Sequence, residues 1–240
     1  MQQSNNERNW MSFSDLMTGL MVIFMFIAIS YIEQINKKQE QRDDIFREFK
    51  SAKDELYQEL KTEFQDDFEA WKVILDKDLS IKFTNPDVLF ESGKTSLRPR
   101  FINILHEFLP RYFNVILKDK YINKILEIRI EGHTDTIPAL MYDKDPYIGN
   151  IILSQLRSAE VLKYFRNMTY FQALSLQQQE RIQFWLTANG LSYGRTLDSD
   201  KILTVKSGKS PNNEYSRRVE FRIVTKSEEL VEKVLLELGN

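Results

Sequence analysis

The sequence predicts an α+β protein with an N-terminal single transmembrane helix, a long helical linker and then a two-layer α/β sandwich. Three observations support this order. Residues 16–32 form one apolar run without a charged side chain. Residues 33–76 contain neither glycine nor proline and repeat apolar side chains at helical spacing. From residue 79 onward, strand-like runs alternate with helical patterns, which is typical of a two-layer α/β domain.

Length and composition narrow the classes of function. The chain has 240 residues, so an anchor and a linker leave a domain of ordinary size. Its net charge of −2 argues against a nucleic-acid partner, and the absence of cysteine excludes disulfides and cysteine metal sites. His106 and His133 are too far apart in sequence to suggest a metal site. No glycine-rich phosphate loop or nucleophile elbow is present, so we expect no cofactor and no enzymatic activity.

The apolar run is long enough for a membrane-spanning helix. At ~1.5 Å per residue, residues 16–32 cover ~26 Å, so a helix over residues 13–32 would span a bilayer. A helix that begins at Phe13 places Asp15 inside the apolar zone. An acidic side chain there costs ~2.5–3.5 kcal/mol, so we expect it to face a partner helix or a water-filled path. The alternative is that Asp15 lies at the interface and interacts favourably with the helix dipole.

A cleaved signal peptide would also contain an apolar run near the N-terminus. The segment before this run has one arginine, Arg8, and no lysine, and no small-x-small cleavage site follows it. We therefore expect an uncleaved anchor. Charge does not fix its orientation, because Lys37 and Lys38 follow the span and favour the opposite topology to the one expected below.

The charged linker, residues 33–77, carries one apolar stripe. Its spacing predicts a helix that either pairs with a second copy or packs on the chain's own domain, and we favour pairing. The stripe does not follow a strict heptad repeat, so a leucine zipper is not expected. It consists of Phe49, Leu56, Leu60, Phe64, Phe68, Trp71 and Leu75.

The soluble domain, residues 78–240, shows alternating strands and helices. In the last strand, Val219, Phe221 and Ile223 share one face, and charged side chains occupy the other. The predicted strands are residues 80–83, 124–131, 183–188 and 218–225. The predicted helices are residues 99–117, 151–167, 176–182 and 227–238.

The N-terminal segment resembles a known family of ion-driven membrane proteins. The string Trp10-Met11-Ser12-Phe13-Ser14-Asp15-Leu16-Met17-Thr18-Gly19-Leu20-Met21 is similar to the start of the B subunit of MotB-type stators. The resemblance implies that Asp15 carries the ion and that Thr18, one turn on, is its polar neighbour. It also implies a bacterial inner-membrane protein, with residues 1–12 cytoplasmic and the C-terminal domain periplasmic.

Residues 79 to about 226 resemble an OmpA-like peptidoglycan-binding domain. Four motifs occur in the family's order: Phe90-x2-Gly93-x3-Leu97, Ile130-Glu131-Gly132-His133-Thr134-Asp135, Asn150-x2-Leu153-Ser154-x2-Arg157 and Arg217-Arg218-Val219-Glu220. The resemblance implies that Asp135 and Arg157 bind the diaminopimelate of the stem peptide. This ligand presents an ammonium and a carboxylate on one carbon, and a carboxylate with a forked guanidinium can bind both groups.

The same resemblance supplies further candidates and leaves alternatives. Thr134, Leu153 and Arg217 are expected beside the ligand, and Arg217 rather than Arg218 because the two alternate across a strand. Asn150 is expected to contact the stem peptide, to cap the following helix, or both. We expect His133 to brace the loop. Taken alone, Asp135 would more simply cap a loop and Arg157 would be a solvated helix residue. The segment between Gly132 and Asn150 is longer than in the family, so we expect the rim of the site to depart from the family's.

Together these features imply a B subunit of an ion-driven rotary motor that is anchored to peptidoglycan. By resemblance it would be a homodimer inside a ring of polytopic MotA/ZorA-like subunits. The short chain lacks an obvious plug and a Pro/Gly-rich tether, so it is more similar to the B subunits of Zorya anti-phage systems than to flagellar MotB. A flagellar stator and a passive peptidoglycan-anchoring membrane protein are the alternatives. We expect protons rather than sodium to be translocated.

Overall fold

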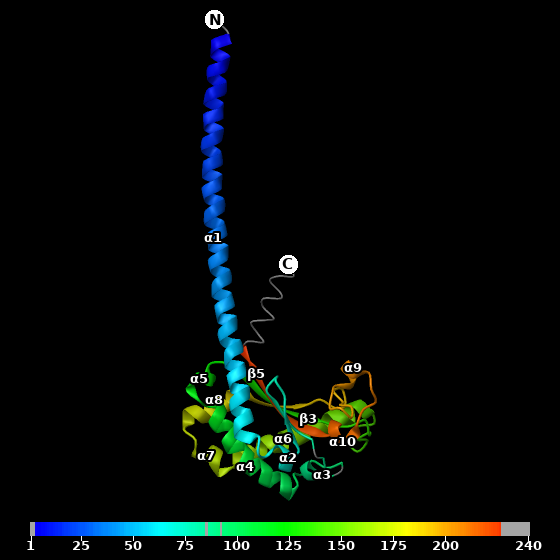
Figure 1. Cartoon of the computed structure of the whole chain (residues 1–240). Coiled ribbons are helices and arrows are strands. Elements are labelled where there is room, and N and C mark those ends of the chain that lie inside the picture. Colours follow the sequence, from blue (N-terminus) through cyan, green and yellow to red (C-terminus); the bar gives the residue numbers. More distant parts are fainter. Residues whose placement is uncertain (1–2, 85, 92, 227–240) are drawn as a thin grey trace. The chain divides into compact units, whose positions relative to one another are not determined.

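The computed structural model describes the backbone of residues 3–84, 86–91 and 93–226, and side chains from Leu16 onward except at positions 41, 45, 86 and 87. The chain divides into two compact units, residues 1–48 and residues 49–240. Helix α1 (Gln3–Phe64) contributes to both units (Figure 1). The two units are described separately below.

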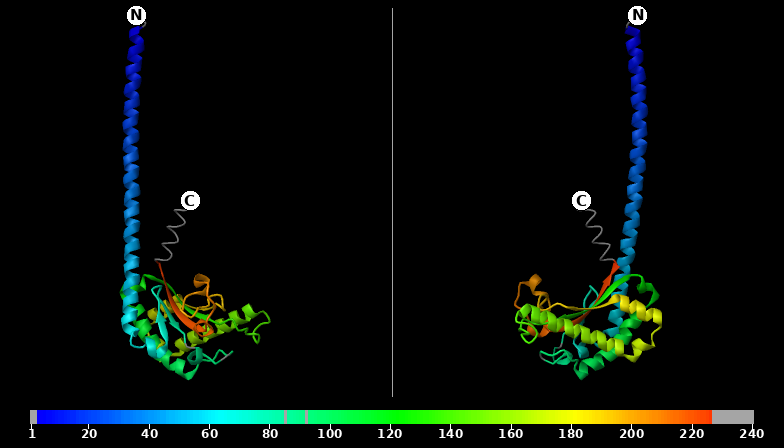
Figure 2. Two further views of the ribbon diagram at one scale, coloured as in Figure 1. Left: turned by 45° about the vertical axis from the view of Figure 1, so that its right-hand side comes forward. Right: turned by 180° about the vertical axis from the view of Figure 1, so that it is seen from behind.

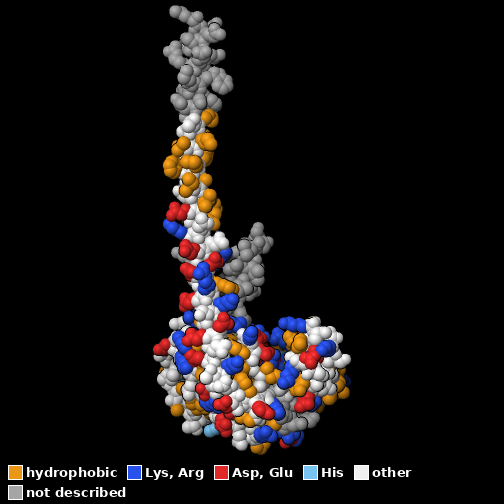
Figure 3. Space-filling model, in the orientation of Figure 1, with side chains coloured by type: hydrophobic (Ala, Val, Ile, Leu, Met, Phe, Trp, Pro, Cys, Tyr) orange, Lys and Arg blue, Asp and Glu red, His pale blue; other side chains and the backbone are white. Residues whose placement is uncertain are grey.

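The first unit is the N-terminal part of α1. Within the described residues, α1 is the one helix that is long and apolar enough to cross a membrane. The apolar side chains of residues 16–32 are exposed and form a band around the helix (Figure 3). The helix begins at Gln3 and not at the predicted Phe13. Neither proline nor glycine occurs between these two positions, so nothing in the sequence stops the helix earlier.

In the second unit, the C-terminal turns of α1 are part of the hydrophobic core. Leu56, Leu60 and Phe64 are at most 2 % exposed. The Phe64 ring lies 5.1 Å from that of Phe108, centroid to centroid. For these residues the expected pairing with a second copy is wrong, and the alternative of packing on the chain's own domain is confirmed. The domain therefore begins inside the helix rather than after it.

Ion pairs fix the same helical turns to the domain. Arg111 donates from Nε to Glu63 (2.6 Å) and from Nη1 to Asp67 (2.7 Å), and its guanidinium lies 4.7 Å above the Phe64 ring. Lys118 donates to Glu59 at 2.6 Å. Burial opposes ionisation of Glu59, but its lysine partners outweigh burial and lower its pKa to about 2.

The helical linker ends earlier than predicted. After Phe64 come a short helix α2 (Phe68–Trp71) and a strand β1 (Val73–Leu75), so the prediction of helix through residue 76 is wrong. Lys72 adopts a left-handed conformation with φ of 54°, which redirects the chain. Val73 and Ile74 are β-branched and pair with the next strand, where such side chains pack well.

One five-stranded sheet forms the centre of the domain. Its spatial order is β1-β2-β5-β3-β4, and all neighbours are antiparallel except the parallel pair β3–β4. The strands after β1 are β2 (Ser80–Phe83), β3 (Ile125–His133), β4 (Leu186–Gly190) and β5 (Arg218–Thr225).

Helices cover one face of this sheet, which confirms the two-layer α/β class (Figure 2). Phe108 of α4 lies 5.1 Å from both Phe83 and Phe221, with edge-on rings. The helices of the domain after α2 are α3 (Pro86–Leu89), α4 (Pro99–Ile116), α5 (Asp119–Ile122), α6 (Pro146–Asn167), α7 (Thr169–Ala173), α8 (Leu176–Trp185), α9 (Thr204–Ser207) and α10 (Asn213–Ser216).

Several predicted boundaries need correction. Helix α6 begins at Pro146 and not at residue 151, because Asp145 caps it by accepting from the N–H groups of Tyr147 and Ile148. Strand β4 begins at Leu186 and not at residue 183, because α8 continues through Trp185. The predicted final helix, residues 227–238, lies outside the described residues.

Replacing Leu60 with alanine tests the docking of α1 on the domain. We expect Leu60→Ala to lower the free energy of unfolding by about 2–5 kcal/mol, because the leucine is fully buried. The matched control is Leu176→Ala, since Leu176 is 72 % exposed. Urea unfolding followed by tryptophan fluorescence measures both variants. Equal, small effects would contradict the packing described here.

Candidate functional site

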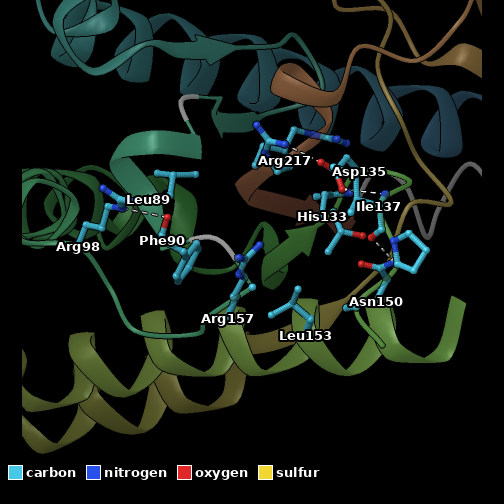
Figure 4. A pocket seen from close by; sticks show the side chains of 15 residues that line it. Leu89, Phe90, Arg98, His133, Asp135, Ile137, Asn150, Leu153, Arg157 and Arg217 are labelled. Atoms are coloured by element: carbon cyan, nitrogen blue, oxygen red, sulfur yellow. Dashed lines mark hydrogen bonds and ion pairs between the residues drawn. The ribbon is translucent and has the colours of Figure 1, made fainter. Parts of the chain in front are cut away.

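A pocket of about 330 Å³ opens where the end of β3, helix α6 and the segment before β5 meet. Figure 4 shows its side chains converging from these elements. The structure brings together most of the residues that the sequence motifs single out. They are Thr134, Asp135, Asn150, Leu153, Arg157 and Arg217.

Asp135 lies two residues after the end of β3 and is held by hydrogen bonds at both carboxylate oxygens. Oδ1 accepts from the N–H of Ile137 at 3.0 Å, and Oδ2 accepts from Nη1 of Arg217 at 2.6 Å. Asp135 therefore caps the loop, as the alternative interpretation expects, and at the same time forms an ion pair inside the pocket. The 4 % exposure of Asp135 strengthens this ion pair relative to a surface one.

Arg157 enters the pocket from α6 and is not the solvated helix residue of the alternative interpretation. Its Nε donates to the carbonyl oxygen of Lys94 (3.0 Å) and its Nη2 to that of Glu91 (3.3 Å). The guanidinium lies 4.8 Å from the centroid of the Phe90 ring. Burial lowers the pKa of Arg157 to about 10, so the group is still charged at neutral pH. Within the described residues, no hydrogen bond occupies its Nη1, which can serve an anionic ligand.

Two glycines allow α6 to approach the sheet closely enough to place Arg157. A Cβ at Gly132 would lie 2.2 Å from the backbone oxygen of Ser154, and one at Gly190 would lie 2.4 Å from the nitrogen of Gln155. Gly132 and Gly190 are direct partners in the β3–β4 register. Gln155 also donates to the Ala188 carbonyl at 2.9 Å, which joins α6 to the edge strand.

Asn150 positions the loop and does not cap the helix. It lies in α6 beyond the N-terminus, so the capping prediction is wrong, and Asp145 takes that role. The Nδ2 of Asn150 donates to the carbonyl oxygens of Ile137 and Pro146, both at 3.0 Å. Asn150 therefore ties the loop that follows Asp135 to the helix that carries Arg157.

Thr134 and Leu153 complete this side of the pocket. The backbone N–H of Thr134 donates to the carbonyl of Ser192 at 3.0 Å. Its hydroxyl is buried and makes no hydrogen bond within the described residues. Leu153 is 5 % exposed and lies one helical turn before Arg157, where it provides an apolar wall.

The two consecutive arginines play different roles, as the alternation across the strand predicts. Arg217 pairs with Asp135 and its side chain is 35 % exposed. Arg218 contributes to the pocket lining but is buried and donates from Nε to Glu220 at 2.5 Å. The pocket wall also includes Arg98, which the motif pattern did not assign; its Nε donates to the Phe90 carbonyl at 3.1 Å. A lone arginine before a helix gives no sequence signal for such a role.

His133 does not brace a loop as expected. It is the last residue of β3, and its side chain is 1 % exposed between Glu131 and Glu220. Burial, together with the charge of Arg218, lowers the pKa of His133.

The predicted ion-carrying residues lie in α1. The backbone of Asp15 is helical, but its side chain falls outside the described part of the structure. Thr18 is exposed in the same helix, three residues further on. The proposed roles of Asp15 and Thr18 stay predictions.

Comparison with known proteins decides the family. No protein-family model matches the chain. The chain is 35% identical over 238 residues to the Zorya protein ZorB of Escherichia coli, and the match covers 98% of this chain and 96% of that protein. The chain belongs to the Zorya protein ZorB family. The ZorB match extends over almost the whole chain, so it includes both α1 and the pocket-bearing domain.

Solved structures also resemble parts of this ZorB-family chain. The cell wall anchor of the T6SS from Pseudomonas aeruginosa is 23% identical, with a TM-score of 0.45, and the match covers 69% of this chain and 96% of that chain. The periplasmic domain of Helicobacter pylori MotB (residues 97–256) is 16% identical, with a TM-score of 0.41, covering 70% of this chain and 99% of that chain.

The close approach of α6 to β3 predicts a strong effect of one methyl group. Gly132→Ala should destabilise the domain by about 3 kcal/mol, because the new Cβ would overlap backbone and not a flexible side chain. Gly194→Ala is the matched control, since a Cβ there has no neighbour closer than 3.6 Å. Thermal unfolding of both variants measures the difference, and a Gly132→Ala protein as stable as the control would contradict this account of the packing.

Proposed function

We propose that this chain is the B subunit of an ion-driven rotary motor of the Zorya type, anchored in the bacterial inner membrane and bound to peptidoglycan. Membership of the ZorB family over nearly the whole chain supports the Zorya assignment. The observation that carries the wall-binding part is the pocket that gathers Asp135, Arg157 and Arg217. The motor would act in defence against phages, with the domain after the membrane helix in the periplasm.

The pocket suits the zwitterionic centre of diaminopimelate. The carboxylate of Asp135 would accept from the ligand's ammonium, and the forked guanidinium of Arg157 would donate to its carboxylate. Before ligand binds, Arg217 neutralises the buried Asp135. An incoming ammonium would share or replace that cation, while Arg217 would turn to a second carboxylate of the stem peptide. Leu153 and Phe90 would exclude water around these contacts.

The membrane helix would supply the ion pathway. An acidic residue near the start of an apolar span has no use in a passive tether and is costly to insert, so Asp15 would bind and release the translocated ion, with Thr18 as a polar neighbour. Protons need only this carboxylate, which is why we propose protons over sodium. A ring of polytopic A subunits would surround two B chains.

Helix α1 would connect these two functions. An ion that crosses ~100 mV delivers ~2.3 kcal/mol per charge, and it drives rotation only if one part of the motor is held still. The wall-bound domain would provide this hold, because the last turns of α1 are packed into its core. Since Leu56, Leu60 and Phe64 are used in that packing, we propose that dimerisation uses the membrane helix and residues 33–48.

Binding to isolated sacculi tests the pocket. We expect Asp135→Ala and Arg157→Ala each to weaken sacculus binding by about 30-fold, which corresponds to the loss of ~2 kcal/mol for a charge-assisted contact. Asp66→Ala and Arg100→Ala are matched controls at exposed positions of the same domain. Pull-down with purified sacculi, with thermal melting to verify folding, gives the measurement. Wild-type binding by both folded pocket variants would reject the assignment.

Replacing Asp15 with its near-isosteric amide separates a motor from a passive tether. We expect Asp15→Asn to abolish phage defence in cells while expression and membrane insertion persist, because the amide cannot carry a proton. Asp54→Asn, at an exposed position of α1 outside residues 33–48, is the control and should keep full activity. Efficiency of plating of phages measures the effect. Normal phage defence in the Asp15→Asn strain would reject the motor and favour a passive peptidoglycan-anchoring protein.

A further inference from the structure

A cluster of ionisable side chains adjoins the pocket, whose lining includes one of its members, His133. It consists of Glu131 and His133 of β3 and Glu220 of β5. Glu131 and Glu220 are direct partners in the antiparallel register, and His133 is paired with Arg218. The Nε2 of His133 lies 3.5 Å from Oε2 of Glu131 and 3.6 Å from Oε1 of Glu220.

These side chains are buried, and their polar atoms are incompletely satisfied. All three are at most 4 % exposed. Within the described residues, neither ring nitrogen of His133 makes a hydrogen bond, and neither does Oε2 of Glu131. Buried polar atoms almost always have a partner, because leaving them without one costs free energy. Here the imidazole of His133 faces the carboxylates of Glu131 and Glu220, at nitrogen–oxygen distances at the outer limit of a hydrogen bond.

We propose that Glu131, His133 and Glu220 bind one divalent transition-metal ion, of which Zn²⁺ is the best match. Imidazole nitrogen and carboxylate oxygen are both common zinc ligands. Around a tetrahedral zinc with bonds of 2.0–2.1 Å, neighbouring ligand atoms lie roughly 3.3 Å apart. The nitrogen–oxygen separations of 3.5 and 3.6 Å are close to that edge length, and all three ligand atoms lie within 4.8 Å of one another, so side-chain adjustments would be needed to close the site.

The charges around the cluster set its affinity. Two carboxylates face one buried cation, Arg218, which donates to Oε1 of Glu220 at 2.5 Å. Arg218 contacts the same oxygen that faces His133, so it fixes the orientation of the Glu220 carboxylate and also reduces its attraction for an ion. Lys82, the cross-strand partner of Glu220, is paired with Asp76 at 2.6 Å.

One further cation stands beside the cluster. Arg195 lies 3.6 Å from Oε2 of Glu131, and its side chain is 47 % exposed. It has room to turn toward solvent when an ion enters. A water would complete four-coordination at the position nearest to it. The partial compensation of the two carboxylates by arginine favours a micromolar rather than a tighter site.

An ion here would stiffen the wall-binding pocket from behind. His133, the last residue of β3, is two residues before Asp135, and Glu220 of the neighbouring strand β5 is three residues after Arg217. An ion that joins the two strands at this point would fix the positions of Asp135 and Arg217 relative to each other. The metal site itself does not depend on the proposed function, because the test below uses no peptidoglycan.

Metal titration of the full chain in detergent, after chelator treatment, tests the proposal. We expect isothermal titration to show one Zn²⁺ per chain at micromolar affinity, and Co²⁺ to give the visible absorption of a four-coordinate site. Glu131→Gln and His133→Asn should each weaken Zn²⁺ binding at least tenfold. His106→Asn is the matched control, since the other histidine of the chain is exposed on α4 and should not matter.

Two results of these titrations would overturn the proposal. No stoichiometric Zn²⁺ binding by the folded wild-type chain would do so, and so would unchanged binding by both folded cluster variants. If either variant fails to fold, the Zn²⁺-dependent rise in the melting temperature of the wild type, compared with that of His106→Asn, gives an independent answer. An equal rise in both supports the cluster, and no rise in either contradicts it.

Discussion

The close packing of α6 on the parallel pair β3–β4 is the constraint on which the pocket depends. At Gly132 and Gly190 the helix backbone lies so near the sheet that a single Cβ would meet it at 2.2–2.4 Å. This approach places Arg157 over Phe90 and within reach of the Lys94 carbonyl. It also lets Asn150 hold the loop that carries Asp135. Arg157 and Asn150 are therefore positioned by hydrogen bonds to backbone carbonyl groups.

The two faces of the sheet carry different kinds of side chain. The face toward the helices is apolar, with Phe83 and Phe221 stacked edge-on against Phe108 of α4. The opposite face carries charged side chains, among them Arg218 and Glu220, which pair with each other along β5. Because this polar face is itself buried near the ends of β3 and β5, its charges cannot rely on water. These charged groups must pair with one another or bind an ion. Asp135 and Arg217 pair in the pocket, and the cluster of Glu131, His133 and Glu220 is where we propose an ion.

Helix α1 joins a membrane-type segment to this domain without a break in its helical hydrogen bonding between Gln3 and Phe64. Its last turns are held both by apolar burial and by the bridge from Arg111 to Glu63 and Asp67. A connection of this kind resists both pulling and twisting at the domain, because displacing the helix would expose buried leucine and phenylalanine side chains. In the proposed motor, such resistance is what a wall anchor needs.

Local sequence patterns determined much of this protein. An uncharged apolar run of this length predicts a membrane-type helix, and the alternation at Val219, Phe221 and Ile223 predicts a strand with one buried face. The ordered motifs around Asp135, Arg157 and Arg217 indicated which side chains would meet, and those three do lie in one pocket. These features depend on spacing within short segments, and spacing is visible in a sequence.

Contacts between distant segments were decided only by the tertiary structure. An apolar stripe predicts that one face of a helix is buried, but it does not identify the partner. Leu60 is buried against the chain's own domain. Helix α1 ends at Phe64 because β1, a few residues later, pairs with β2. The apolar stripe continues at helical spacing beyond Phe64, so it does not predict this end. Likewise, Arg98 joins the pocket through its contact with the Phe90 carbonyl, and His133 meets Glu220 through the register of β3 with β5. Pairing of residues far apart in the chain is a property of the packed fold, because no local propensity encodes it.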